Sequence, residues 1–146
     1  MKKYKNSMVM GNFCPFHNGH KYLIDTSIEN SEKVYVFVCH RKDDPISGNE
    51  RFLSIKNTYR DNENIIVFNI EHDYDNYPGE RGSTVDEFYD YWVNQIVYKY
   101  VDELDVVFTS EEYGDEFAEY LGVEHFLVDK KRKEYPISGT EIRNNP

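Results

Sequence analysis

The sequence predicts a single α/β domain with a mostly parallel, five-stranded sheet and helices on both of its faces. Three observations predict this architecture. Short apolar segments alternate along the chain with segments of helical periodicity. Several apolar segments are rich in Val, Ile and Phe with little alternation, which is typical of strands covered on both faces. The length of 146 residues suits one domain with its own core, spanning residues 1–146.

The first half of the chain contains three predicted strands and two predicted helices. The strands lie at residues 7–13, 33–39 and 64–70, and the helices at 19–30 and 48–59. The first strand is an apolar run followed by the turn formers Gly11 and Pro15, and apolar residues at helical spacing come next. The second helix follows Ser47, which is placed to form a capping box with Glu50.

The second half contains two predicted strands, at 104–108 and 124–128, and helices at 85–100 and 111–121, with a short one from Gly139. The long helix has Val85, Phe88, Trp92 and Ile96 at helical spacing on one face. Gly122 follows the next helix, where glycine can adopt a left-handed cap. The polar segment 71–84 is expected to be a loop near the site.

Composition narrows the class of protein. The net charge of −10 argues against nucleic acid as a partner, because a duplex binder needs a broad basic surface. No apolar stretch approaches the roughly 20 residues that span a bilayer, and no signal-peptide region is seen, so we expect no membrane contact and a cytoplasmic location. Cys14 and Cys39 are then expected to be reduced thiols. Both a monomer and a homo-oligomer are compatible with the sequence.

The segment GNFCPFHNGH, from Gly11 to His20, is the most informative part of the chain. A strand that turns into a helix near Asn18 exposes backbone amides, which bind anions together with the positive end of the helix dipole. His17 and His20 can donate to phosphate oxygens at the mouth of such a site. The plainest alternative is a turn with two surface histidines.

Two metal interpretations fail on residue type. His17 and His20 have no third ligand at zinc-finger or zincin spacing. The Asp73-x-Asp75 pair lacks the Gly and Glu that a calcium loop needs at its sixth and twelfth positions. We therefore predict no metal ligand from the protein.

A second anion motif lies near the other end of the chain, at Ile137-Ser138-Gly139-Thr140-Glu141-Ile142-Arg143. Helix capping alone would explain Ser138, whereas Thr140 and Arg143 add donors that capping does not need. Arg143 lies about one turn after Thr140, so both can face one anion. A basic run at 130–133 comes shortly before this motif and would help to attract a triphosphate. For three of its four side chains, a solvated loop is the alternative explanation.

The two motifs resemble the nucleotidyltransferase superfamily related to class I aminoacyl-tRNA synthetases. Its GxFxPxHxGH signature is matched at residues 11–20, and its ISxTxxR signature at 137–143. The segments TSEEYG at 109–114 and PISGNER at 45–51 are similar to those of nicotinamide mononucleotide (NMN) adenylyltransferases. The resemblance is strongest to the adenylyltransferase domain of bifunctional bacterial NMN adenylyltransferase/ribosylnicotinamide kinases. It implies a Rossmann-like sheet whose first and fourth strands are neighbours, so that their loops open onto one cleft.

The resemblance implies transfer of AMP from ATP to NMN, giving NAD and pyrophosphate. The NMN phosphate is already an anion at neutral pH, since its second pKa is about 6, so no general base is needed. Mg²⁺ is expected to be held mainly by phosphates and water. The alternatives are another phosphorylated acceptor, such as nicotinate mononucleotide, and a nucleotide-sensing module without turnover.

The resemblance also implies roles for individual residues. The expected catalytic residues are His17, His20, Thr140 and Arg143. The expected ATP-binding residues are Gly11, Asn12, Phe13, His17, Gly19, His20, Ser110, Arg132, Ile137, Ser138, Thr140 and Arg143. The expected acceptor-binding residues are Asn12, Phe13, Arg51 and Trp92.

Three of these assignments have alternatives or depart from the family. Trp92 either stacks on the pyridine ring or belongs to the core, since its helical face is apolar. Arg51 either supplies charge to the acceptor or only decorates a helix. Asn12 stands where many relatives carry Lys or Arg.

The sequence has no GxxxxGK[ST] motif, so we expect no kinase domain. The sequence ends soon after Arg143, which fits either a short natural form or a piece of a longer chain.

Overall fold

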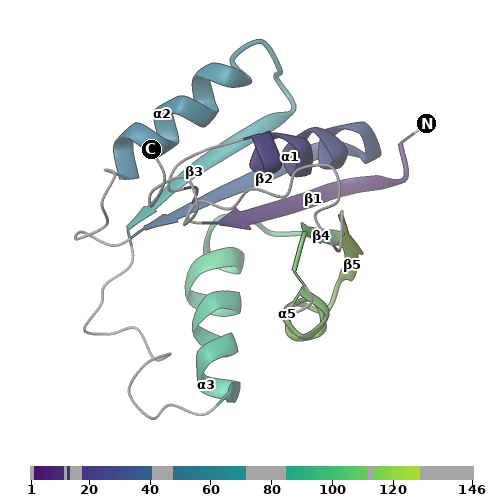
Figure 1. The fold of residues 1–146 in the computed structure, drawn as a ribbon. Coiled ribbons are helices and arrows are strands. Elements are labelled where there is room, and N and C mark those ends of the chain that lie inside the picture. The colour runs from purple at the N-terminus through teal and green to yellow at the C-terminus, as the bar shows by residue number, and fades with distance from the viewer. Residues whose placement is uncertain are drawn as a thin grey trace.

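Five strands form one parallel sheet in the order β3-β2-β1-β4-β5 (Figure 1). The structure is a computed structural model that describes residues 2–11, 13, 18–40, 48–71, 85–111 and 114–128. The strands are β1 (Tyr4–Gly11), β2 (Ser31–His40), β3 (Ile65–Glu71), β4 (Val106–Thr109) and β5 (Glu124–Leu127). Every neighbouring pair among them is parallel, which confirms the predicted α/β class.

Helices connect the strands and cover both faces of the sheet (Figure 1). They are α1 (Asn18–Asn30), α2 (Gly48–Thr58), α3 (Val85–Asp90), the π-helix η3 (Tyr91–Val97), α4 (Tyr98–Tyr100) and α5 (Gly114–Leu121). None of the helices in the described part of the chain is both long and apolar enough to cross a bilayer.

The strands point alternate side chains into two apolar cores, one on each face of the sheet. Leu23 and Ile24 of α1 and Ile55 of α2 pack in the core that contains Val9 of β1. Val93 of η3 belongs to the core on the other face, with the residues Met8, Phe37, Val107, Phe117 and Leu121. Neighbouring residues of one strand, such as Met8 and Val9, therefore lie in different cores, which explains the continuous apolar runs in the sequence.

The helix predicted at 85–100 exists, but it is not an α-helix throughout. Its middle, η3, is a π-helix, and the N–H of Tyr98 donates to the C=O of Val93, five residues earlier. The wider turn changes which residues face inward. Val93, Ile96 and Val97 are buried, whereas Trp92 lies at the margin of the core.

Several predicted boundaries were wrong by two or three residues. β1 starts at Tyr4, because Tyr4 pairs with Ser31, and it ends at Gly11 rather than at Phe13. β4 begins at Val106 rather than at 104. Helix α5 begins at Gly114 rather than at 111, because Thr109 and Glu111 form a side-chain-stabilised turn before it.

Gly122 caps α5 as predicted. Its φ is +77°, and a Cβ added there would meet nothing within 4 Å. The N–H of Gly122 donates to Glu119 O at 3.1 Å, and that of Val123 donates to Ala118 O at 3.0 Å. These bonds satisfy the last carbonyls of the helix and turn the chain into β5.

Candidate active site

The candidate site lies at the carboxyl ends of β1 and β4, which are neighbours in the middle of the sheet. The chain runs from β1 outward through β2 to β3 and then returns to place β4 on the other side of β1. Met8 of β1 pairs with Val107 of β4. Ligands of open α/β sheets bind at such a reversal of strand order. The expected neighbourhood of the first and fourth strands is confirmed.

Phe13 forms an apolar floor under the end of β1. Its side chain is only 1% exposed, although its backbone has a φ of +51°, a left-handed conformation that is uncommon for a bulky residue. A Cβ on Gly11 would lie 3.1 Å from Cζ of the Phe13 ring, so the absence of a side chain at Gly11 lets the ring fold back under the end of β1.

His20 stands in the first turn of α1 and contacts this floor. Its ring meets Phe13 edge to face, with centroids 4.8 Å apart and an interplanar angle of 77°. Gly19 and His20 are partly exposed, and the first turn of α1 carries no acidic side chain. The helix start therefore offers backbone N–H groups and an imidazole with no carboxylate in that turn, an arrangement that suits a phosphate.

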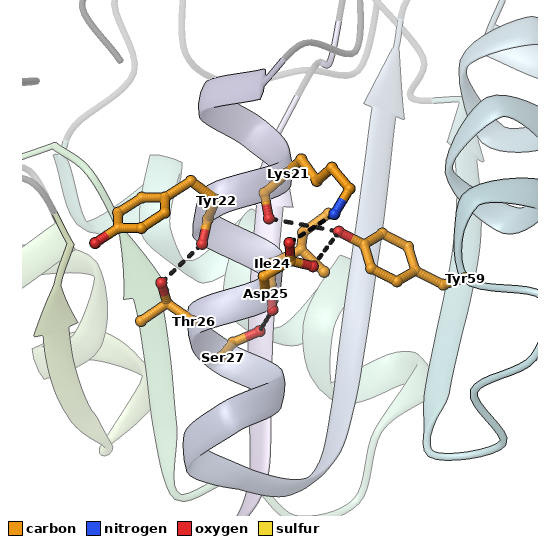
Figure 2. Close-up of polar contacts among 7 residues, drawn as sticks. All are labelled: Lys21, Tyr22, Ile24, Asp25, Thr26, Ser27 and Tyr59. Atoms are coloured by element: carbon orange, nitrogen blue, oxygen red, sulfur yellow. Dashed lines mark hydrogen bonds and ion pairs between the residues drawn. The ribbon is translucent and has the colours of Figure 1, made fainter. Parts of the chain in front are cut away.

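A polar cluster at the edge of the core fixes α1 against the end of α2 (Figure 2). The hydroxyl of Tyr59, just after α2, donates to Asp25 Oδ1 at 2.8 Å, and Lys21 Nζ lies 2.7 Å from Asp25 Oδ2. Within α1 the buried Ser27 hydroxyl donates to Ile24 O at 2.7 Å. Burial raises the pKa of Tyr59 well above its usual value, and its hydrogen bond to Asp25 raises it further.

A second polar cluster lies where β4 ends. Thr109 is buried, and its hydroxyl donates to Glu111 O at 2.9 Å. The ring of His125 on β5 is 2.6 Å from Thr109 Oγ1 through Nε2, and 2.7 Å from Asp115 Oδ1 through Nδ1. A Cβ on Gly114 would lie 2.2 Å from His125 Nε2, so only glycine fits there without a shift. Ser110, a predicted ATP ligand, follows Thr109 directly and is partly exposed.

A third cluster lies at the carboxyl end of β2. His40 is buried, and its Nε2 is 2.7 Å from Asn69 Oδ1 on β3. Gly48 begins α2 against the same ring, since a Cβ there would lie 2.3 Å from three ring atoms of His40. Arg51, one turn further along α2, is only 2% exposed. The interpretation of Arg51 as surface decoration is therefore wrong.

The location of Trp92 agrees with the core alternative. The side chain is partly buried and packs against the core that contains Val93 and Ile96. Its ring also meets Tyr91 edge to face at 5.4 Å between centroids. Stacking of Trp92 on a pyridine ring stays a prediction.

The remaining expected site residues lie outside the described residues: Asn12, His17, Arg132, Ile137, Ser138, Thr140 and Arg143. The same holds for Ser47, the loop residues Asp73 and Asp75, and the helix expected from Gly139. Their roles stay predictions. Within the part of the chain that the structure describes, no group of three or more His, Cys, Asp or Glu side chains is placed to hold a metal ion.

Sequence reasoning missed both buried histidines of these clusters. His40 and His125 stand on strands, and their partners are distant along the chain, so no local motif marks them. The one available signal was glycine at Gly48 and Gly114, each of which begins a helix where a side chain would collide with a histidine.

The fold and the HxGH motif together define a domain of the HxGH nucleotidyltransferase type. The chain belongs to the family described as citrate lyase ligase C-terminal domain, whose model matches residues 5–133.

Among curated proteins, the chain is similar to the trifunctional NAD biosynthesis/regulator protein NadR of two bacteria. The identity to the Escherichia coli K12 protein is 30% over 158 residues, covering 95% of this chain and 36% of that protein. The identity to the Salmonella typhimurium LT2 protein is 28% over 165 residues, covering 99% of this chain and 38% of that protein. The chain thus spans well under half the length of these relatives.

Solved structures share the fold. A bifunctional NMN adenylyltransferase/ADP ribose pyrophosphatase from Francisella tularensis, complexed with AMP and a Mn ion, superposes with a TM-score of 0.67 at 19% identity. That match covers 98% of this chain and 42% of the other. A NadR protein in complex with NAD and AMP-PNP gives a TM-score of 0.63 at 22% identity, covering all of this chain and 44% of the other.

Proposed function

We propose that the chain is an adenylyltransferase domain that transfers AMP from ATP to NMN, giving NAD and pyrophosphate. The observation that carries the proposal is the arrangement of Gly11, Phe13 and His20 at the junction of β1 and β4. There a partly exposed imidazole and the first turn of α1 lie at the edge where open α/β sheets bind their ligands. The similarity to NadR and to an NMN adenylyltransferase supports the choice of acceptor.

In the proposed reaction, an oxygen of the NMN phosphate attacks the α-phosphorus of ATP. A new P–O bond forms while the bond from the α-phosphorus to the bridging oxygen breaks, and pyrophosphate leaves with the electron pair. The protein has to align two anions and stabilise the charge that develops on the α-phosphoryl and leaving oxygens. No protein nucleophile takes part.

His20 and His17 are proposed to donate to the phosphates, with His20 nearest the reacting α-phosphoryl group. Phe13 keeps the His20 ring in place through their edge-to-face contact. Thr140 and Arg143, with Ser138, are proposed to hold the β- and γ-phosphates. Mg²⁺, when bound, neutralises phosphate charge, and the lack of a carboxylate in the first turn of α1 suits a cation carried by phosphates and water.

On the acceptor side, Arg51 is proposed to supply positive charge that Asn12 does not bring. The burial of Arg51 near the start of α2 supports this role, because a guanidinium keeps its charge even when it is buried. Trp92 is the weaker candidate for the acceptor site, since it packs against the core.

The test is pyrophosphate release from Mg·ATP with a panel of acceptors: NMN, nicotinate mononucleotide, phosphopantetheine and glycerol 3-phosphate. The proposal predicts release with NMN, with NAD formed in equal amount, and much slower release with the last two. Faster release with nicotinate mononucleotide would identify that compound as the acceptor and would leave the proposed adenylyl transfer unchanged. Tight ATP binding without release for any acceptor would favour a nucleotide-sensing module. The description of the matching family names a citrate lyase ligase and no nucleotide acceptor. The assay therefore has to identify the acceptor.

A further inference from the structure

His125 is a buried titratable residue that the proposed reaction does not use. Its side chain is only 5% exposed, and it lies on β5, the neighbour of β4, whose carboxyl end borders the candidate site. Both of its ring nitrogens are engaged, Nδ1 with Asp115 at 2.7 Å and Nε2 with Thr109 at 2.6 Å. A buried imidazole with both nitrogens engaged has a fixed orientation.

The two partners of His125 lie at the two ends of one short segment. Thr109 is the last residue of β4, and Asp115 lies in the first turn of α5. One ring therefore holds the segment 109–115 at its start and at its end. Asp115 is 85% exposed, so the sequence alone would class it as a surface carboxylate at a helix start.

Two further contacts transmit the position of the ring to the backbone. Oγ1 of Thr109 donates to Glu111 O at 2.9 Å and accepts from Glu111 N at 3.3 Å, which fixes the turn that contains Ser110. Gly114 lies so close to the ring that an added Cβ would come within 2.5 Å of both His125 Cε1 and Thr109 Oγ1. The helix start is thus seated directly on the hydrogen-bonded pair.

The location of the segment suggests what these contacts of His125 do. It leaves β4 at the carboxyl edge of the sheet, next to the strand that leads to Phe13 and His20. Ligands bind at this reversal of strand order, so the residues directly after β4, Ser110 and Glu111, lie at the edge of the proposed site.

We propose that His125 is a positioning residue for the nucleotide: through Thr109 and Asp115 it fixes the end of β4 and the start of α5, and so holds Ser110 where it can bind ATP. The inference rests on the proposed function. His125 acts through these two partners, so it differs in kind from His20, which is proposed to contact the phosphates itself.

The test measures equilibrium binding of Mg·ATP by calorimetry, without turnover, in wild-type protein and three variants. Thr109→Val removes the hydroxyl and keeps the side-chain shape. Asp115→Ala removes the partner of Nδ1. Glu119→Ala is the matched control, because it removes an exposed carboxylate from the same helix outside the hydrogen-bonded cluster.

We expect the dissociation constant for ATP to rise about three- to tenfold in Thr109→Val and Asp115→Ala, the scale of one lost hydrogen bond, and less than twofold in Glu119→Ala. Binding of NMN, measured separately, should change less than twofold in all three. Hydrogen exchange of the amides in segment 109–115 should quicken in the first two variants only, and this readout needs no ligand.

Three outcomes would overturn the inference. If Thr109→Val and Asp115→Ala bind ATP as tightly as wild type while unfolding at lower temperature, His125 has a structural role only. If Glu119→Ala weakens binding as much as Asp115→Ala does, the effect is one of net charge. If wild-type protein binds no ATP, the proposed function and this inference both fail, whereas the first two outcomes leave the proposed function intact.

Discussion

The rings of Phe13 and His20 meet edge to face, with their centroids 4.8 Å apart and their planes at 77°. Phe13 is buried with a left-handed backbone, and a Cβ added at Gly11 would lie 3.1 Å from Cζ of its ring. The orientation of the histidine that we propose for catalysis thus depends on contact with a buried phenylalanine. An edge-to-face pair contributes about 0.5–1.5 kcal/mol beyond burial.

Phe13→Leu should lower turnover more than its effect on stability explains. Leucine keeps the site apolar and removes the ring edge on which His20 rests, so we expect kcat to fall about tenfold and stability by about 1 kcal/mol. Phe37→Leu is the control, since Phe37 is equally buried but belongs to the core on the other face of the sheet. Equal kcat values for the two variants, at similar unfolding midpoints, would show that the contact with His20 does not matter.

Gly48→Ala should destabilise the fold by about 1–3 kcal/mol, the usual cost of overpacking. The added methyl would lie 2.3 Å from the His40 ring, which is hydrogen-bonded through Nε2 to Asn69. Urea unfolding measures the loss. In the double variant with His40→Ala, the Gly48→Ala substitution should cost much less, because the collision is gone. Additive losses would mean that the ring of His40 is not what excludes a side chain at Gly48.

The sequence was enough to predict the elements and their order, because each strand contains an apolar run and the helices show helical periodicity, with a capping or glycine signal at one end of several of them. It was not enough for features that depend on contacts between distant segments. The π-helix at Tyr91–Val97 has the same apolar spacing as an α-helix over so few residues. The start of β1 at Tyr4 is polar in composition and becomes a strand through pairing with β2.

The residues of the candidate site also fall into those that a local motif marks and those that only distant contacts bring together. Gly11, Gly19 and His20 belong to a local motif, so their neighbourhood follows from the sequence. The histidines His40 and His125 each have a partner on another strand or helix, and only the assembled sheet brings them together. The left-handed conformation of Phe13 was also unexpected, since the predicted strand ran through it.

Tyr59→Phe should destabilise the fold by about 1–2 kcal/mol, the scale of a hydrogen bond to a charged group. The variant removes only the hydroxyl that donates to Asp25 at 2.8 Å and so loosens α1 from the end of α2. Tyr100→Phe is the control, since this residue is 45% exposed, and we expect a change within about 0.5 kcal/mol. Urea midpoints of the two variants give the comparison, and equal midpoints would contradict a role of the Tyr59 hydroxyl.

Cys39 should make the protein less stable as pH rises above 9. Burial raises the pKa of this thiol from its usual value near 9.0 to about 12, so the folded state favours the neutral thiol. The associated stability is therefore fully present below about pH 9 and is lost as pH rises toward 12. The slope from this one group is up to about 1.4 kcal/mol per pH unit.

Urea unfolding of wild type and Cys39→Ala at pH 8 and pH 10 tests this point. Wild type should lose about 1 kcal/mol more than the variant over this interval. Burial also raises the pKa of Tyr59, whose unfolded value is about 10, but Tyr59 is present in both proteins. Its ionisation therefore affects their stability equally and does not enter the comparison. Parallel pH dependence of the two proteins would mean that the Cys39 thiol ionises as readily in the folded chain as in the unfolded one.

We propose that His20 stabilises the transition state of adenylyl transfer at the edge of β1 and β4. The most direct measurement is kcat for ATP-dependent pyrophosphate release by His20→Ala, with NMN as acceptor and with circular dichroism to confirm an unchanged fold. We predict a fall of roughly 10²–10³, the scale for losing a donor to the transition state. A wild-type rate in a folded His20→Ala protein would show that His20 does not stabilise the transition state.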